Sequence, residues 1–170
     1  MTTAQFSNEA TRVRDPRAAG FVPASYFRDL EVFPFNFVQV GAGNAGSTAT
    51  LVYLQRGRYR IFPHMSRLYH SAFGASRLLD IGLSAYTQED GTTVALADNR
   101  FDNDINVSSA SAANGIVLGS SLSAADTAGI DVLVGGVTNL DGLGIIATVA
   151  GGTIPDAAIL RGYFVISRIP

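Results

Sequence analysis

The chain has 170 residues, of which 15% are charged and none is cysteine, and its formal net charge is −2 at pH 7. Without cysteine it forms no disulfides and no thiolate metal sites, and a thiol nucleophile is excluded. The acidic balance argues against nucleic-acid binding, and no run of about twenty apolar residues exists to span a membrane.

Charge is unevenly distributed along the chain. Residues 1–77 carry nine arginines against four carboxylates, a balance of +5, and residues 78–170 carry three against ten, a balance of −7. We expect either attraction between subunits or docking of the basic part on an acidic surface. All twelve basic residues are arginine, which indicates either fixed bidentate contacts with carboxylates or the codon bias of a GC-rich genome. The low charged fraction indicates either contact surfaces or a large core.

Residues 1–31 are predicted to form an extended N-terminal arm. Their charges alternate in sign, Pro16 and Pro23 interrupt any long helix, and only short helical turns near residues 8–14 and 25–30 are expected. The first residues lack the layout of a secretory signal, so we expect the protein to be made in the cytoplasm and to stay there or leave inside an assembly. We expect a partner to hold the arm, through its four arginines: Arg12, Arg14, Arg17 and Arg28.

From Val32 onward the pattern is typical of β-structure, and residues 32–170 are predicted to form one domain. Phe33, Phe35 and Phe37 alternate along one face, and Pro34 indicates an edge or first-strand position. Residues 64–73 are expected to form an aromatic-rich loop, and residues 98–114 either a loop or a short helix. Further strands are predicted at residues 48–54, 58–62, 76–86, 92–97, 116–118, 130–134, 143–149 and 158–166. The fold class is therefore all-β, an antiparallel sandwich or jelly roll.

A glycine-rich segment resembles a nucleotide-binding loop. Residues 41–46 read Gly-Ala-Gly-Asn-Ala-Gly, the G-x-G-x-x-G pattern of dinucleotide sites. The segment that follows is β-branched and short, and no acidic residue lies between Glu31 and Asp80 to hold a ribose. We therefore predict a hairpin turn.

Three other patterns contain metal-ligating or catalytic residue types. His64 and His70 are too few for a zinc site, and His70, Ser71 and Asp80 lack the sequence context of a hydrolase triad. A calcium-loop template is matched at four positions, although its glycine is replaced by Val107 and its glutamate by Ala113; the four are Asp102, Asp104, Asn106 and Ser108. We predict no catalytic site, no metal and no cofactor.

Arginines alternate at Arg56, Arg58 and Arg60. In an extended strand all three project from one face, while Tyr59 and Ile61 project from the other. The pattern indicates either a stripe that binds an acidic neighbour or an edge that arginine protects from aggregation.

One stretch resembles small head proteins of tailed bacteriophages. Residues 72–83, with Gly74-Ala75-Ser76-Arg77 before the aliphatic residues and Asp80, are similar to an extended strand common in those proteins. An acidic turn at residues 88–91, a Thr-rich strand at 92–96 and a polar segment at 99–104 continue the resemblance, which covers residues 70–170.

The resemblance implies a decoration (cement) protein on the outside of the capsid, with no active site. Its partners would be the major capsid protein and further copies of itself, with a trimer favoured, and its location would be the virion. The alternatives are another virion component (head completion, tail or fibre base) and a carbohydrate- or ligand-binding sandwich. The last predicts an exposed aromatic platform, with Tyr59, Tyr69 and Phe73 as candidates.

Overall fold

The computed structural model describes residues 30–44, 46–88, 90–122, 129–134 and 142–169. The chain divides into two units, Met1–Leu30 and Glu31–Pro170. The predicted arm lies outside the described residues except for its last two positions, and so do its helical turns and its four arginines.

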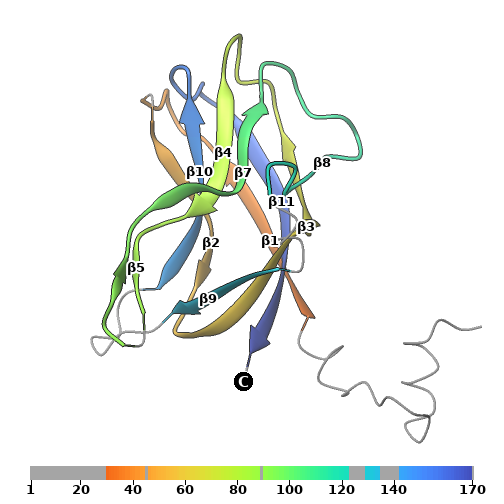
Figure 1. Ribbon diagram of the computed structural model, residues 1–170. Coiled ribbons are helices and arrows are strands. Elements are labelled where there is room, and N and C mark those ends of the chain that lie inside the picture. Colours follow the sequence, from red (N-terminus) through yellow and green to blue (C-terminus); the bar gives the residue numbers. More distant parts are fainter. Residues whose placement is uncertain (1–29, 45, 89, 123–128, 135–141, 170) are drawn as a thin grey trace, which may run out of the picture. The chain divides into compact units, whose positions relative to one another are not determined.

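The second unit is built from two antiparallel sheets, which confirms the predicted all-β class (Figure 1). The first sheet has the order β1 (Leu30–Val38), β11 (Ile159–Ile169), β3 (Gly57–His70) and β8 (Ile116–Val117), and β9 (Ile130–Val134) also pairs with β3. The second sheet has the order β2 (Thr48–Leu54), β10 (Leu143–Ala150), β4 (Leu78–Leu83) and β7 (Ala97–Asn106). A small hairpin joins β5 (Tyr86–Thr87) to β6 (Thr93–Val94).

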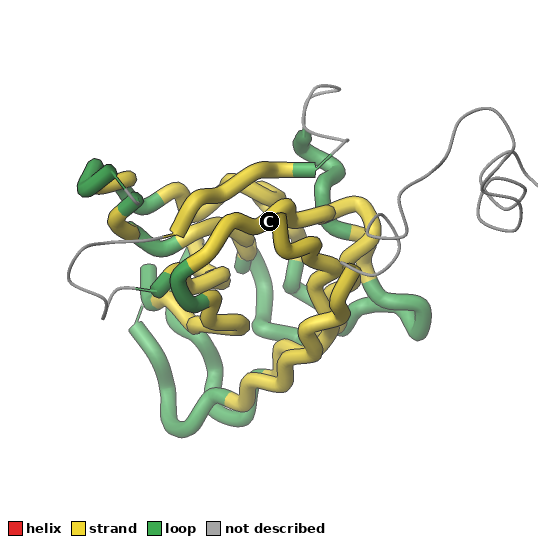
Figure 2. The backbone as a smooth tube through the Cα atoms, turned by 90° about the horizontal axis from the view of Figure 1, so that it is seen from below, coloured by secondary structure: helices red, strands yellow, loops and turns green. Residues whose placement is uncertain are grey.

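The strands pair in a nested order. The innermost pair is β4 with β7, and around it lie β3 with β8 and β9, then β2 with β10, and finally β1 with β11. Successive pairs belong to alternate sheets, so the chain winds as one double ribbon. Figure 2 shows the strands around a common interior. This nesting is the jelly-roll arrangement of eight strands, with the short strands β8 and β9 together in the place of one.

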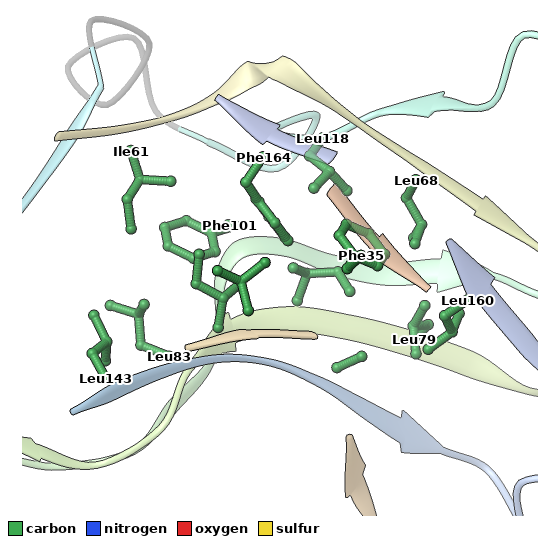
Figure 3. Packing of buried hydrophobic residues seen from close by; sticks show 14 of the residues in the cluster. Phe35, Ile61, Leu68, Leu79, Leu83, Phe101, Leu118, Leu143, Leu160 and Phe164 are labelled. Atoms are coloured by element: carbon green, nitrogen blue, oxygen red, sulfur yellow. The ribbon is translucent and has the colours of Figure 1, made fainter. Parts of the chain in front are cut away.

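The core lies between the two sheets and is apolar. Phe164 of β11 packs against Phe35 of β1, with ring centroids 5.3 Å apart, and against Phe101 of β7 at 6.2 Å. Figure 3 shows these rings among aliphatic side chains from both sheets, including Leu79 and Leu143. Burial of alternate side chains on each strand is the main source of stability in such a sandwich.

The alternation that was predicted for the first strand is confirmed. Phe35 is buried, Phe33 and Phe37 pack against the core, and their neighbours are exposed. β1 is an edge strand of its sheet, as Pro34 indicated, because proline cannot donate a hydrogen bond to a ladder.

Two of the sequence predictions are wrong. The expected strand 58–62 and aromatic loop 64–73 are largely one strand, β3, which continues to His70. Residues 98–106 of the expected loop or helix region 98–114 belong to β7. β7 contains a bulge opposite β4. Ile81 of β4 pairs with Asp102, and Leu83, only two residues later, pairs with Ala97, so β7 has extra residues between these two pairs. The extra residues cross Gly82, where a Cβ atom would lie 2.0 Å from the Ala97 carbonyl oxygen, so glycine is required there.

A bulge in β3 explains why its second half was misread as a loop. Tyr163 pairs with Arg67 and Val165 with Phe62, so residues 63–66 of β3 lie opposite Phe164 alone. Pro63 has no N–H to donate. The buried Ser66 hydroxyl bridges the gap, because it donates to Phe62 O at 2.8 Å and accepts from Val165 N at 3.0 Å.

Replacing this hydroxyl tests its role. Ser66→Ala is expected to lower the free energy of unfolding by about 1–3 kcal/mol, because a buried N–H of Val165 loses its acceptor. Ser108→Ala, at an exposed position, is the matched control and is expected to change stability by less than about 0.5 kcal/mol. Urea denaturation followed by circular dichroism measures both, and equal midpoints for the two variants would contradict the role.

Candidate partner-binding surface

The outer surface of the β1–β11–β3–β9 sheet carries most of the outward-pointing arginines. Because Tyr59, Ile61, Leu68, Leu160 and Phe164 point into the core, the side chains between them point outward. The outward arginines are Arg58, Arg60 and Arg67 of β3 and Arg161 of β11, against one described carboxylate, Asp131 of β9. We call this surface the basic face.

The predicted arginine stripe is divided by the structure. Arg58 and Arg60 are exposed on the basic face, while Tyr59 and Ile61 are buried, as expected. Arg56 is exposed but lies in the bend before β3. Arg60 binds Asp131 through two hydrogen bonds, of which Nη2 to Oδ2 measures 2.7 Å, and this interaction lowers the pKa of Asp131. A carboxylate of the same chain therefore already binds one guanidinium of the stripe.

Apolar side chains share the basic face with the arginines. Val32 is 62% exposed and Val38 48%, both on the outward side of the edge strand β1, and Ile159 of β11 is 36% exposed. Val165, Tyr163 and Ile169 continue the outward side of β11. A sheet face that combines exposed aliphatic residues with arginine is typical of protein contacts.

A groove of about 860 Å³ lies at one end of this face. Tyr69 of β3 stands opposite Arg161 of β11, and Tyr163 of β11 stands opposite Arg67 of β3, so tyrosine and arginine alternate across the two strands. Tyr69, Arg161 and Tyr163 line the groove, together with Asn36 of β1 and residues 110–113. Its volume is within the usual range of binding sites, about 300–1,000 Å³.

The segment beside the groove is fixed to β3. Ser111 N donates to His70 O at 3.0 Å, and the Ser111 hydroxyl accepts from His70 N at 3.0 Å. Arg67 Nη1 donates to Asn114 O at 3.0 Å. The groove wall is therefore held by hydrogen bonds at both of its ends.

His70 is the buried polar residue of this groove. Its Nδ1 lies 2.9 Å from Ser71 O and must donate, because a carbonyl oxygen only accepts. In the neutral ring, Nε2 is then an acceptor, and among the described residues it has no hydrogen-bond partner. His64, six residues earlier, is exposed on the β3 bulge beside Phe62. The two histidines therefore do not converge on one site.

The opposite sheet is acidic on its outer side. Asp80 of β4 points outward, because Leu79 and Ile81 are buried, and its Oδ1 accepts from Asp104 N at 2.8 Å. Burial raises the pKa of Asp80, and the carboxylates of Asp104, Asp98 and Asp102 raise it further, while the hydrogen bond from Asp104 N lowers it. The two sheets therefore differ in charge: arginines are in excess on the outer side of the first, and carboxylates are in excess on the second, where Arg100 of β7 is also exposed.

The first part of the calcium-loop template, residues 102–106, is a strand and not a loop. Asp102 and Asp104 lie on β7, and the Asp102 side chain is fully buried. Its carboxylate accepts from the N–H groups of Asn103 and Gly119 and from the Ser120 hydroxyl, the last at 2.8 Å. These bonds occupy the carboxylate and fasten the turn after β8, which is a structural role.

The glycine-rich segment is not the predicted hairpin turn, because it joins β1 of one sheet to β2 of the other and these two strands do not pair. Gly41 N donates to Asp156 Oδ1 at 2.7 Å, Gly43 N to Ile154 O at 2.9 Å and Gly46 N to Val149 O at 3.0 Å. The strand β2 follows, where a nucleotide site needs a helix. The N–H groups that would bind a pyrophosphate are thus used within the protein.

The remaining sequence candidates do not assemble. Asp80 bonds to Asp104 and His70 to Ser71 O, so no hydrogen-bonded triad forms among them. Within the described residues, no group of three or more His, Asp or Glu side chains could hold a metal ion. Of the three candidates for an aromatic platform, Tyr59 and Phe73 are buried, and Tyr69 is half-buried and lines the groove.

The sequence analysis singled out neither Arg161 nor Tyr163. The strand 159–169 was predicted, and its period-two alternation places both residues outward once Leu160 and Phe164 are assigned to the core. Their proximity to Arg67 and Tyr69, more than ninety positions earlier, depends on the pairing of β11 with β3, for which the sequence contains no local signal.

No protein family, curated protein or solved structure was found to match this chain. In the part of the chain that the structure describes, no helix is long and apolar enough to cross a membrane.

The raised pKa of Asp80 predicts a pH dependence of stability. A carboxyl whose pKa is higher in the folded state favours folding while protonated, and this contribution is lost as pH rises from its ordinary value of 3.8 through the raised value. Asp80→Asn keeps an oxygen for the Asp104 N–H and removes the charge. The variant is therefore expected to be at least as stable as the parent at pH 7, with its advantage shrinking toward pH 3.

Asp90→Asn is the control of opposite sign. The Thr92 N–H lowers the pKa of Asp90, so this carboxylate favours folding above its ordinary pKa, and its replacement brings no gain at pH 7. Urea midpoints measured from pH 3 to pH 8 compare the two variants. A loss of stability in Asp80→Asn at pH 7 would show that the ionised carboxylate is stabilising.

Proposed function

We propose that this chain is a non-catalytic structural protein of a tailed-phage virion, which binds the outside of the capsid and cements neighbouring capsomers. The basic face carries the proposal, because it presents four arginines and exposed aliphatic side chains against a single described carboxylate. Arginine forms bidentate contacts with carboxylates, and the apolar residues between them favour burial against a protein.

The fold and the sequence resemblance support the same role. Jelly rolls occur in viral capsid domains, and also in lectins and cupins, so the fold alone does not decide between them. The resemblance of residues 70–170 to phage head proteins favours the first. A cement protein makes the same contact many times on a symmetric shell, so modest affinity at each site is sufficient.

The proposed partners are the major capsid protein and further copies of this chain, with a trimer favoured, and the proposed location is the capsid exterior. The proposed contacts with the partner are Arg56, Arg58 and Arg60, together with the arginines of residues 1–29. Because Arg60 is bound to Asp131, we assign the larger share of the contact to the arginines nearer the groove, with Arg58 at the rim.

Copy number tests the proposal. Gel densitometry of purified particles is expected to give between about one copy per capsid subunit and one per three, as closed oligomers on a symmetric shell require. A chain lacking residues 1–29, which keeps all of β1, is expected at a clearly lower ratio. A few copies per particle would instead indicate a neck, tail or fibre-base component, and absence from particles would refute a virion role.

A further inference from the structure

The groove differs from the rest of the basic face in shape and in composition. Arg60 is bound to Asp131, and Arg58 lines a smaller hollow of about 360 Å³ beside that carboxylate, whereas Arg161 lines the larger groove between two tyrosines. A charged group in a concave site is partly shielded from water, so an ion pair formed there is stronger than one on an open surface. Tyrosine and arginine are also the residue types that most often dominate binding energy at protein interfaces.

The groove offers a distinct set of polar groups. Arg161 is exposed and supplies the donors that a carboxylate accepts. Asn36 lines the same groove and is exposed, and its side-chain amide both donates and accepts hydrogen bonds. His70 pairs with Leu160 and its Nε2 is buried, so this atom is not one of the groove's binding groups. A peptide presents both complementary groups, namely side-chain carboxylates and backbone N–H donors.

We propose that this groove is a binding site for an extended, carboxylate-bearing peptide segment of a partner protein, held by Arg161 between Tyr69 and Tyr163. The inference rests on the proposed protein-binding role of the basic face and names the part of that face that selects the partner. The arginines outside the groove, including Arg58, form the rim of the same interface and contribute mainly to long-range attraction. Aromatic or aliphatic residues that alternate with the carboxylates pack on the two tyrosine rings.

Charge decides between the partner classes that fit a groove of this size. The basic face has four outward arginines against Asp131, and Asp131 is bound to Arg60. A neutral saccharide gains nothing from that excess of positive charge, and a basic segment is repelled by it. An acidic segment is attracted and finds apolar contacts beside its charges.

Fluorescence anisotropy with labelled peptides tests the proposal on the isolated protein. The probe is a hexapeptide in which Glu and Phe alternate, and its control has Gln in place of Glu. We expect the Glu peptide to bind at least about tenfold more tightly than the Gln peptide in 0.1 M salt, and oligogalacturonate, an acidic saccharide, to compete weakly.

Arg161→Ala is expected to abolish the preference for the Glu peptide. The matched control, Arg100→Ala, removes an exposed arginine of β7 on the other sheet, outside the proposed contact surface, and is expected to change the affinity by less than about threefold. Both side chains are exposed, so circular dichroism should show the parental fold in both variants.

Three outcomes would overturn the proposal: binding of neither peptide, equal losses in the two arginine variants, or preferential binding of oligogalacturonate. The first two would leave only a diffuse positive surface, and the third would identify a saccharide site. These outcomes are independent of copy number, so an unused groove in a protein abundant in particles refutes the inference and leaves the proposed function standing.

Discussion

The contact of Phe164 with Phe35 and Phe101 is the interaction on which the rest of the structure depends. It joins β11 to β1 within one sheet and to β7 across the interior. Because side chains alternate with period two, burial of Leu160, Phe164 and Ile166 turns the odd-numbered residues of β11 outward. A shift of one residue would place Arg161 in the core, where an unpaired charge is costly. The core therefore fixes which side chains form the basic face.

The pairing of β11 with β3 then brings distant parts of the chain together. Arg67 and Tyr69 belong to the basic first part of the sequence, and Arg161 and Tyr163 to the acidic second part. In the sequence, the basic and acidic residues are separated into a first and a second part. In the jelly roll, they are separated mainly between the outer surfaces of the two sheets. Outward arginines gather on the β3–β11 side, and Asp80, Asp98 and Asp104 lie together on the β4–β7 side, where their mutual repulsion contributes to the raised pKa of Asp80.

Local patterns predicted the strands with regular alternation, such as Thr48–Leu54 and Ile130–Val134, and the edge position of Pro34. They failed where strand pairing is irregular. In β3, four residues form a bulge that the Ser66 hydroxyl closes. In β7, the polar sequence includes a buried carboxylate, Asp102, and a bulge that passes over Gly82. Tertiary hydrogen bonds stabilise these segments and leave no periodic signal. Local alternation was sufficient to identify Arg58 and Arg60 as outward-facing. The groove around Arg161 could not be predicted, because it is formed by strands that lie far apart in the sequence.

The central claim is that the basic face, and not the acidic side, contacts the partner. Hydroxyl-radical footprinting of particle-bound and free protein tests it through three tyrosines. Tyr69 and Tyr163 line the groove on the basic face, whereas Tyr53 of β2 is 55% exposed on the other sheet. We predict that binding slows oxidation of Tyr69 and Tyr163 and leaves Tyr53 unchanged. Protection of Tyr53 with unchanged oxidation of the two groove tyrosines would contradict the account.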